Sequence, residues 1–172
     1  MFKSYDEFLT TSTPYLNYCD QFISSHKLEE EVITDHICYK CESNEEYEHL
    51  RSLLEASPAK YIYQVNLSKR RVAYIGLKQS IQLKNGEIKF IELSDKKDGV
   101  EEVTGFHHVE IYPLKMSYEN LVDLLKQRGE KAELKERPHH TTYDITLSNG
   151  FVIRLTDKPL IKKIAEEELL KF

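Results

Sequence analysis

NGEIKFIELSDK, at residues 85–96, returns further along the chain as NGFVIRLTDK, at residues 149–158. Each copy opens on Asn-Gly, continues through alternating apolar residues, and ends in a hydroxyl-bearing residue followed by Asp and Lys. Asn-Gly between apolar runs is a strong hairpin signal, so each copy is predicted to be a strand that pairs antiparallel with the strand before it. This similarity indicates that the chain contains the same structural unit twice.

A second pair of similar segments lies upstream of these copies. TDHICYKC (34–41) and GFHHVEIY (105–112) each place a histidine directly before a β-branched residue, and both have the composition of a strand. Each is followed by an amphipathic segment that predicts a helix, at 43–57 and at 117–129. The order β-α-β-β-β is therefore predicted to occur twice. Two such units are expected to pack about a pseudo-twofold axis, with a cavity between them that receives matching residues from each.

These signals predict an α+β fold in which two βαβββ modules form a curved, incompletely closed mixed sheet around a cleft, with extra helices at both ends. The N-terminal segment has apolar residues at helical spacing, and Pro14 predicts a break or a second start within it. The predicted division of one compact domain is an N-terminal helical segment (1–31), a first module (32–96), a second module (104–158) and a C-terminal helix (159–172).

The composition is that of an ordinary globular protein. The 172 residues carry a net charge of −5, which argues against sequence-independent binding to nucleic acid. No apolar run is long enough to span a bilayer, and the opening MFKSYDEFLTTS lacks the apolar core of a signal peptide. Three cysteines cannot build a disulfide framework. We therefore expect a cytoplasmic protein with reduced thiols, a small-molecule ligand, no nucleic-acid or membrane partner, and a monomeric or weakly dimeric state.

Strand alternation predicts which side chains face the cavity. In the first strand, His36 and Cys38 share the polar face. In its repeat partner, the polar face carries His108, Glu110 and Tyr112. Cys38 and Tyr112 are therefore predicted to be additional cleft residues.

The same rule sorts the neighbouring polar residues. Asp35 and His107, directly before the two histidines, are predicted to point away from the cavity. His140 falls on the same side as Thr142 and Asp144, and is predicted to be a further cleft residue.

One constellation follows from the repeat. Aligned on their shared ending, the last strands of the two modules place Glu92 and Arg154 at matching positions. His36, His108 and Glu92 are then predicted to meet, with Arg154 in the fourth place. Two imidazoles and one carboxylate can hold a divalent cation. The alternatives are histidines hydrogen-bonded within the sheet and a buried Glu92 whose partner is Arg154 rather than a metal, since a buried carboxylate needs a partner.

The doubled βαβββ unit resembles the vicinal oxygen chelate (glyoxalase/bleomycin-resistance) superfamily. More narrowly, DHICYKC, FIELSD, GFHHVEIY and NGFVIRLTDKPLIKKIAEEE resemble segments of the YecM family of metal-binding proteins. The resemblance covers most of the chain. It implies a metal held by the first and last strands of each module, which here means His36, Glu92, His108 and the position of Arg154. It also implies chelation of neighbouring substrate oxygens, in lyase, isomerase or dioxygenase-like chemistry.

Arg154 departs from that pattern, because arginine stays protonated and cannot be a metal ligand. Three accounts remain open. Arg154 binds an anionic substrate beside a three-ligand metal, or it pairs with Glu92 and leaves no metal, or a shift of register brings Thr156, Glu110 or His140 into the coordination sphere.

Two functions follow, from different classes. The first is a metal-dependent enzyme acting on a small, oxygen-rich and anionic molecule, with Fe, Mn, Ni or Zn as the metal, Glu110 as general base and Arg154 as the anion contact. The second is a metal-free binding protein with a Glu92–Arg154 salt bridge in the cleft. The residues argue equally for a site with a metal and a site without one. A scaffold role is the least favoured, because the sequence shows no repeat array, coiled coil or low-complexity arm.

Overall fold

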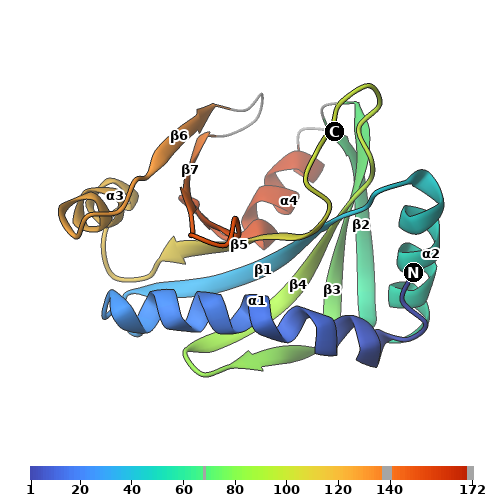
Figure 1. Ribbon diagram of the computed structural model, residues 1–172, viewed down its shortest axis with the longest axis horizontal. Coiled ribbons are helices and arrows are strands. Elements are labelled where there is room, and N and C mark those ends of the chain that lie inside the picture. The colour runs from blue at the N-terminus through green and yellow to red at the C-terminus, as the bar shows by residue number, and fades with distance from the viewer. Residues whose placement is uncertain (68, 137–140, 170–172) are drawn as a thin grey trace.

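The order of the strands in one sheet organises the whole chain. The computed structural model describes residues 1–67, 69–136 and 141–169 (Figure 1). Eight strands form a single mixed sheet in the order β2-β3-β4-β1-β5-β8-β7-β6. The elements are, in chain order, α1 (Tyr5–Ser25), β1 (Val32–Lys40), α2 (Asn44–Ala56), β2 (Ala59–Leu67), β3 (Arg70–Leu83), β4 (Gly86–Ser94), β5 (Gly105–Pro113), α3 (Tyr118–Gln127), β6 (Glu133–Glu136), β7 (Thr141–Thr146), β8 (Val152–Leu155) and α4 (Leu160–Leu169).

The sheet is symmetric about its centre, as the repeat predicts. In the first module β4 runs parallel to β1, and in the second β8 runs parallel to β5. The antiparallel pair of β1 and β5 joins the modules. Because β2 and β6 lie at opposite ends of the strand order, the sheet stays open and does not close into a barrel. The predicted α+β fold with two βαβββ modules and an incompletely closed sheet is confirmed.

The central strand pair contains two irregularities of matching position. Thr34 pairs with Ile111 and His36 pairs with Glu110, so Asp35 is one extra residue in β1. Further along, Cys38 pairs with His108 and Tyr39 with Phe106, so His107 is one extra residue in β5. An extra residue of this kind is a β-bulge, which bends the strand and redirects side chains. Each bulge directly precedes one of the two predicted histidines.

Three helices cover the outer face of the sheet and build the main core (Figure 1). Each begins at a serine, Ser4, Ser43 or Ser117, whose side chain accepts a hydrogen bond from a backbone N–H of the first turn. Their apolar faces pack against the apolar side of the central strands. Fully buried residues of this core include Phe8, Ile23, Ile37, Tyr47, Leu50, Leu54, Ile75, Ile91, Val109, Leu121, Leu125 and Ile153.

Three details differ from the sequence predictions. The predicted break at Pro14 is wrong, because helix α1 continues through this residue. The buried face of α1, from Phe8 to Ile23, packs on the sheet, and this packing offsets the backbone hydrogen bond that proline cannot make. β3, for which the sequence predicts a strand near residues 71–77, extends to Leu83 after an irregular register between Gly76 and Ile81. β6 gives little sequence signal, because all four of its residues are exposed.

The fourth helix lies on the other face. Leu160 and Ile164 of α4 pack with Val72, Tyr74 and Phe90 in a small apolar cluster separate from the main core. Figure 1 shows α4 inside the curve of the sheet. In the described part of the chain, no helix has the length and apolar character needed to cross a membrane.

The central pair should dominate stability. Ile37 of β1 pairs with Val109 of β5, and both side chains are fully buried. Replacing Ile37→Ala is expected to lower the free energy of unfolding by about 2–5 kcal/mol, from lost burial and the cavity left behind. Urea denaturation measures this. Val103→Ala, at a loop side chain that is 72% exposed, is the control and should change stability by no more than about 0.5 kcal/mol. A small effect at Ile37 would contradict the central role of this pair.

Candidate functional site

The inner face of the sheet carries two adjacent rows of polar residues. In one row, the register places His36, Glu110, Arg154 and Asp144 side by side on β1, β5, β8 and β7. The other row runs through Tyr74, Glu92, Cys38 and His108 on β3, β4, β1 and β5. The register also supports the alignment of Glu92 with Arg154, because Glu92 pairs with the residue two positions after His36, and Arg154 with the residue two positions after His108.

The three residues predicted as metal ligands come together. His36 Nε2 lies 3.3 Å from Glu92 Oε2. Ligand atoms of His36, His108 and Glu110 lie within 4.8 Å of one another, as do those of Cys38, Glu92 and His108. Glu110 and Cys38, predicted respectively as general base and cleft residue, therefore belong to the same cluster.

The side chains of this cluster are almost wholly buried. His36 and His108 are each 1% exposed. The Nε2 atom of His36 makes no hydrogen bond of good geometry, and its nearest polar neighbours are carboxylate oxygens of Glu92 and Glu110, at 3.3 and 3.9 Å. A buried nitrogen in this position is satisfied either by a proton that pairs it with these carboxylates or by a bound cation.

Asp35 holds the other side of the His36 ring. Its Oδ2 lies 3.0 Å from His36 Nδ1. The prediction that Asp35 points away is wrong, because the bulge at Asp35 breaks the alternation on which that prediction rests. A carboxylate on the remote ring nitrogen of a histidine fixes its tautomer and leaves Nε2 for a ligand.

The second bulge places His107 beside His108 in the equivalent way. Their Nδ1 atoms are 2.9 Å apart, so the prediction that His107 points away is also wrong, for the same reason. Arg154 Nη1 lies 2.8 Å from His108 Nε2. A guanidinium can only donate, so Nε2 of His108 is the unprotonated nitrogen and Nδ1 carries the proton.

Arg154 is held mainly by Asp144. Its Nε and Nη2 atoms donate to the two carboxylate oxygens of Asp144, at 2.8 and 3.0 Å. Its Nη1 atom is 3.8 Å from Glu110 Oε1. The predicted Glu92–Arg154 salt bridge is wrong, because Asp144 takes the two-point contact of the guanidinium and Glu92 lies against His36 and Cys38.

The remaining predicted residues lie at the margin. Tyr112 is partly exposed, one pleat beyond Glu110, with Ile33 as its strand partner. His140 lies outside the described residues. Thr156, one of the three residues suggested to complete the coordination sphere, is buried and accepts a hydrogen bond from Lys163 of α4. Lys163, whose Nζ is 3.3 Å from Glu110 Oε2, was not predicted as a site residue, because nothing in the composition of the C-terminal helix sets it apart from its neighbouring charged residues.

Burial and neighbouring charges set the protonation of the cluster. Burial disfavours the charged form of His36, yet Glu110 and Asp35 outweigh it and raise the pKa of His36 to about 10. Burial opposes ionisation of Glu92, but its contact with His36 lowers the pKa of that carboxyl to about 2. Burial and Arg154 hold the pKa of His108 well below its usual range. The metal-free cluster therefore contains an imidazolium flanked by carboxylates and a neutral histidine.

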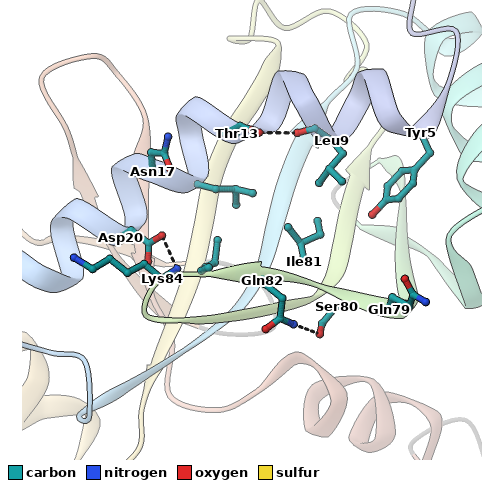
Figure 2. Close-up of a pocket in the computed structure, with 12 residues that line it drawn as sticks. Tyr5, Leu9, Thr13, Asn17, Asp20, Gln79, Ser80, Ile81, Gln82 and Lys84 are labelled. Atoms are coloured by element: carbon teal, nitrogen blue, oxygen red, sulfur yellow. Dashed lines mark hydrogen bonds between the residues drawn. The ribbon is translucent and has the colours of Figure 1, made fainter.

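The cluster is distinct from a groove on the outer face. This groove, with a volume of about 530 Å³, lies between α1 and the far half of β3 (Figure 2). It opens where the register of β3 and β4 is irregular, and Asp20 ties its end by accepting from the backbone N–H groups of Lys84 and Asn85. None of the residues of the polar cluster lines it.

A family model and solved structures place the chain among known proteins. The family model described as YecM protein matches residues 3–160. The chain therefore belongs to the YecM protein family, which confirms the resemblance seen in the sequence. No curated protein matches the chain.

A solved structure of 17% identity shows the same fold. The structural-genomics structure of Protein EC4020 is 17% identical and has a TM-score of 0.73, with 94% of this chain and 92% of that chain covered. Methylmalonyl-CoA epimerase, as the selenomethionine protein, is 13% identical with a TM-score of 0.48, and 74% of this chain and 95% of that chain are covered. A variant of the Streptomyces coelicolor epimerase in complex with 2-nitronate-propionyl-CoA is 13% identical with a TM-score of 0.46, covering 72% and 94%.

The Arg154–Asp144 pair gives a stability prediction. Asp144→Ala is expected to lower the free energy of unfolding by about 3–5 kcal/mol, because it leaves the buried guanidinium without its two-point partner. The double variant Asp144→Ala with Arg154→Met removes both charges and should recover much of that loss. Urea denaturation of both single variants and the double variant measures the coupling. Additive losses would show that the two side chains do not act as a pair.

The pKa of His36 gives a pH prediction for chelator-treated protein. Because the folded pKa of about 10 lies above the ordinary value of 6.5, the protonated ring stabilises the fold fully below pH 6.5. This contribution is lost as the pH rises toward 10. The melting temperature of the metal-free wild type should therefore fall more steeply between these values than that of His36→Gln. Parallel curves would contradict the raised pKa.

Proposed function

We propose that the chain is a metal-dependent enzyme of the vicinal oxygen chelate type, acting on a small, oxygen-rich and anionic molecule. The observation that carries this proposal is the buried Nε2 of His36, which makes no hydrogen bond of good geometry and faces the carboxylates of Glu92 and Glu110. The duplicated sheet with both histidines on its inner face supports the assignment to this superfamily.

The donor set fits a divalent cation. Imidazole and carboxylate are ligands for Fe, Mn, Ni and Zn. The distances of 3.3 and 3.9 Å from His36 Nε2 to the oxygens of Glu92 and Glu110 are compatible with ligand atoms that each lie about 2 Å from one ion. His36, Glu92 and Glu110 would hold the metal, and His108 would join them once Arg154 Nη1 releases its Nε2 atom. Asp35 would act as the positioning residue of His36.

The charge balance of the cluster supports the same conclusion. Buried charges are tolerated when they are paired, and the cluster holds more acids than permanent bases. The four carboxylates and two basic side chains are Asp35, Glu92, Glu110, Asp144, Arg154 and Lys163. With His36 neutral, as a metal ligand has to be, the excess is two negative charges, which equals the charge of one divalent cation. Without a metal, the protonated His36 ring offsets one of them.

The residues around the metal have separable roles. When bound, the cation would supply Lewis acidity toward substrate oxygens. Glu110 fits a ligand better than a general base, because His36, Lys163 and Arg154 hold its pKa below the usual range although burial opposes this. Arg154, fixed by Asp144, would present its Nη1 donor to an anionic group of the substrate.

One observation favours a second function, a metal-free binding protein. Arg154 Nη1 already donates to His108 Nε2 and so occupies the lone pair that a metal would use. In this alternative the guanidinium replaces the metal, and the cluster holds a small anion through Arg154.

Metal analysis separates the two functions. Protein purified without chelator and dialysed against Mn(II), Ni(II) or Zn(II) is expected to retain about one equivalent of metal, as a three- or four-ligand site would. His36→Ala should lose it, and Asp35→Ala should weaken metal affinity by about 10–100-fold, because the remote ring nitrogen loses its carboxylate. Elemental analysis and calorimetric titration measure both.

The matched control is His49→Ala, which removes an exposed histidine of α2 outside the cluster. It should retain the wild-type metal content. Equal and substoichiometric metal in wild type and His36→Ala would reject the metal site and leave the metal-free alternative.

A further inference from the structure

The C-terminal helix α4 covers the candidate metal site. The other three helices pack on the outer face, whereas α4 packs on the inner face that carries the polar cluster (Figure 1). Its apolar contact joins Leu160 and Ile164 to Val72, Tyr74 and Phe90, and partly buried side chains of β2 (Tyr63, Val65 and Leu67) pack against this cluster. Beneath this face His36 and Cys38 are 1% and 0% exposed. On this face only a small part of the cluster reaches the surface, since the Glu92 side chain is 14% exposed while the His36 side chain is 1% exposed.

Two polar contacts of α4, both within residues 160–165, are made to residues of the site itself. The backbone N–H of Leu160, at the start of the helix, donates to Asp35 Oδ2 at 2.9 Å. The same oxygen atom is the partner of His36 Nδ1. One turn later, Lys163 Nζ lies 3.3 Å from Glu110 Oε2 and donates to Thr156. The docking of the helix thus depends on the same carboxylates that would hold or orient the metal ligands.

A metal and the docked lysine compete for one carboxylate. A cation bound by Glu110 would take up the negative charge that now faces Lys163 and would add positive charge beside its Nζ atom, on a side chain that is 13% exposed. The metal-bound state and the docked state of α4 therefore destabilise each other. Any such antagonism is reciprocal, so undocking of the helix favours metal binding by the same factor by which metal binding favours undocking.

We propose that α4 is a displaceable cover of the inner face, in which Lys163 competes with the metal for Glu110, so that metal loading releases the helix and opens the site to its small-molecule ligand. This inference rests on the proposed metal site. It assigns to Lys163 and Asp35 a role in access that goes beyond coordination: Lys163 closes the site, and Asp35 links the start of α4 to His36.

The first experiment measures metal affinity in full-length variants by calorimetric titration with Ni(II). Lys163→Met removes the competing charge, and Ile164→Ser weakens the apolar docking without changing any charge. Both should bind Ni(II) about 5-fold or more tightly than wild type, as expected for a typical coupling between two linked equilibria. Lys162→Met, at the exposed neighbouring lysine, is the matched control and should leave the affinity unchanged.

The second experiment reports on the cover without a metal. In a Cys19→Ala, Cys41→Ala background, Cys38 is the one remaining thiol and lies buried on the inner face. Its labelling by a thiol reagent in chelator-treated protein should be faster in Lys163→Met and Ile164→Ser than in Lys162→Met. In wild-type protein, Ni(II) should accelerate hydrogen exchange of the amides of residues 160–165.

The outcomes distinguish the two proposals. Wild-type Ni(II) affinity in all variants, with unchanged Cys38 labelling, overturns the cover while the metal site stands. Tighter Ni(II) binding in Lys163→Met alone, with no change in Ile164→Ser or in Cys38 labelling, would show that only the local charge of Lys163 matters. This result also overturns the proposed cover. If no variant binds metal, the proposed function fails together with metal-linked release.

Discussion

The antiparallel pairing of β1 with β5 is the constraint on which the rest of this structure depends. It joins the two modules, and it places Ile37 and Val109 in the outer core while His36, Cys38, His108 and Glu110 face inward. Every other strand of the sheet is placed relative to this pair by its own register. The same hydrogen-bonded ladder therefore supports the fold and sets the spacing of the polar cluster.

The bulges in this pair convert an ordinary ladder into a site. A regular strand alternates its faces, and each histidine would then stand without a neighbour along its own strand. The extra residues at 35 and 107 put a second polar group beside each imidazole. The two β-bulges have different effects on the neighbouring histidine. Asp35 gives His36 a negative partner, whereas burial, Arg154 and His107 keep His108 neutral. Equivalent positions of the two modules therefore carry side chains of different chemistry.

Arg154 shows how strongly charge balance constrains such a buried cluster. Its position matches that of Glu92 in the repeat, so the second module carries a cation where the first carries an anion. Asp144 compensates it with a two-point contact, and Lys163 from outside both modules compensates Glu110. The helix that brings Lys163 also closes the inner face. Charge compensation and access to the cluster are thus coupled in one element.

The sequence by itself determined the repeat, the two modules, the open mixed sheet and the meeting of His36, Glu92 and His108, because hydrophobic periodicity and matched motifs are local signals that survive in the fold. Only the tertiary structure decided that Asp35 and His107 face the cluster, since one extra residue in a ladder reverses the alternation and leaves no compositional mark. It also decided that Asp144, rather than Glu92, pairs with Arg154, and that Lys163 reaches Glu110. Those contacts join segments far apart in the chain, where the register and the docking of a helix, rather than the identity of any residue, select the partner.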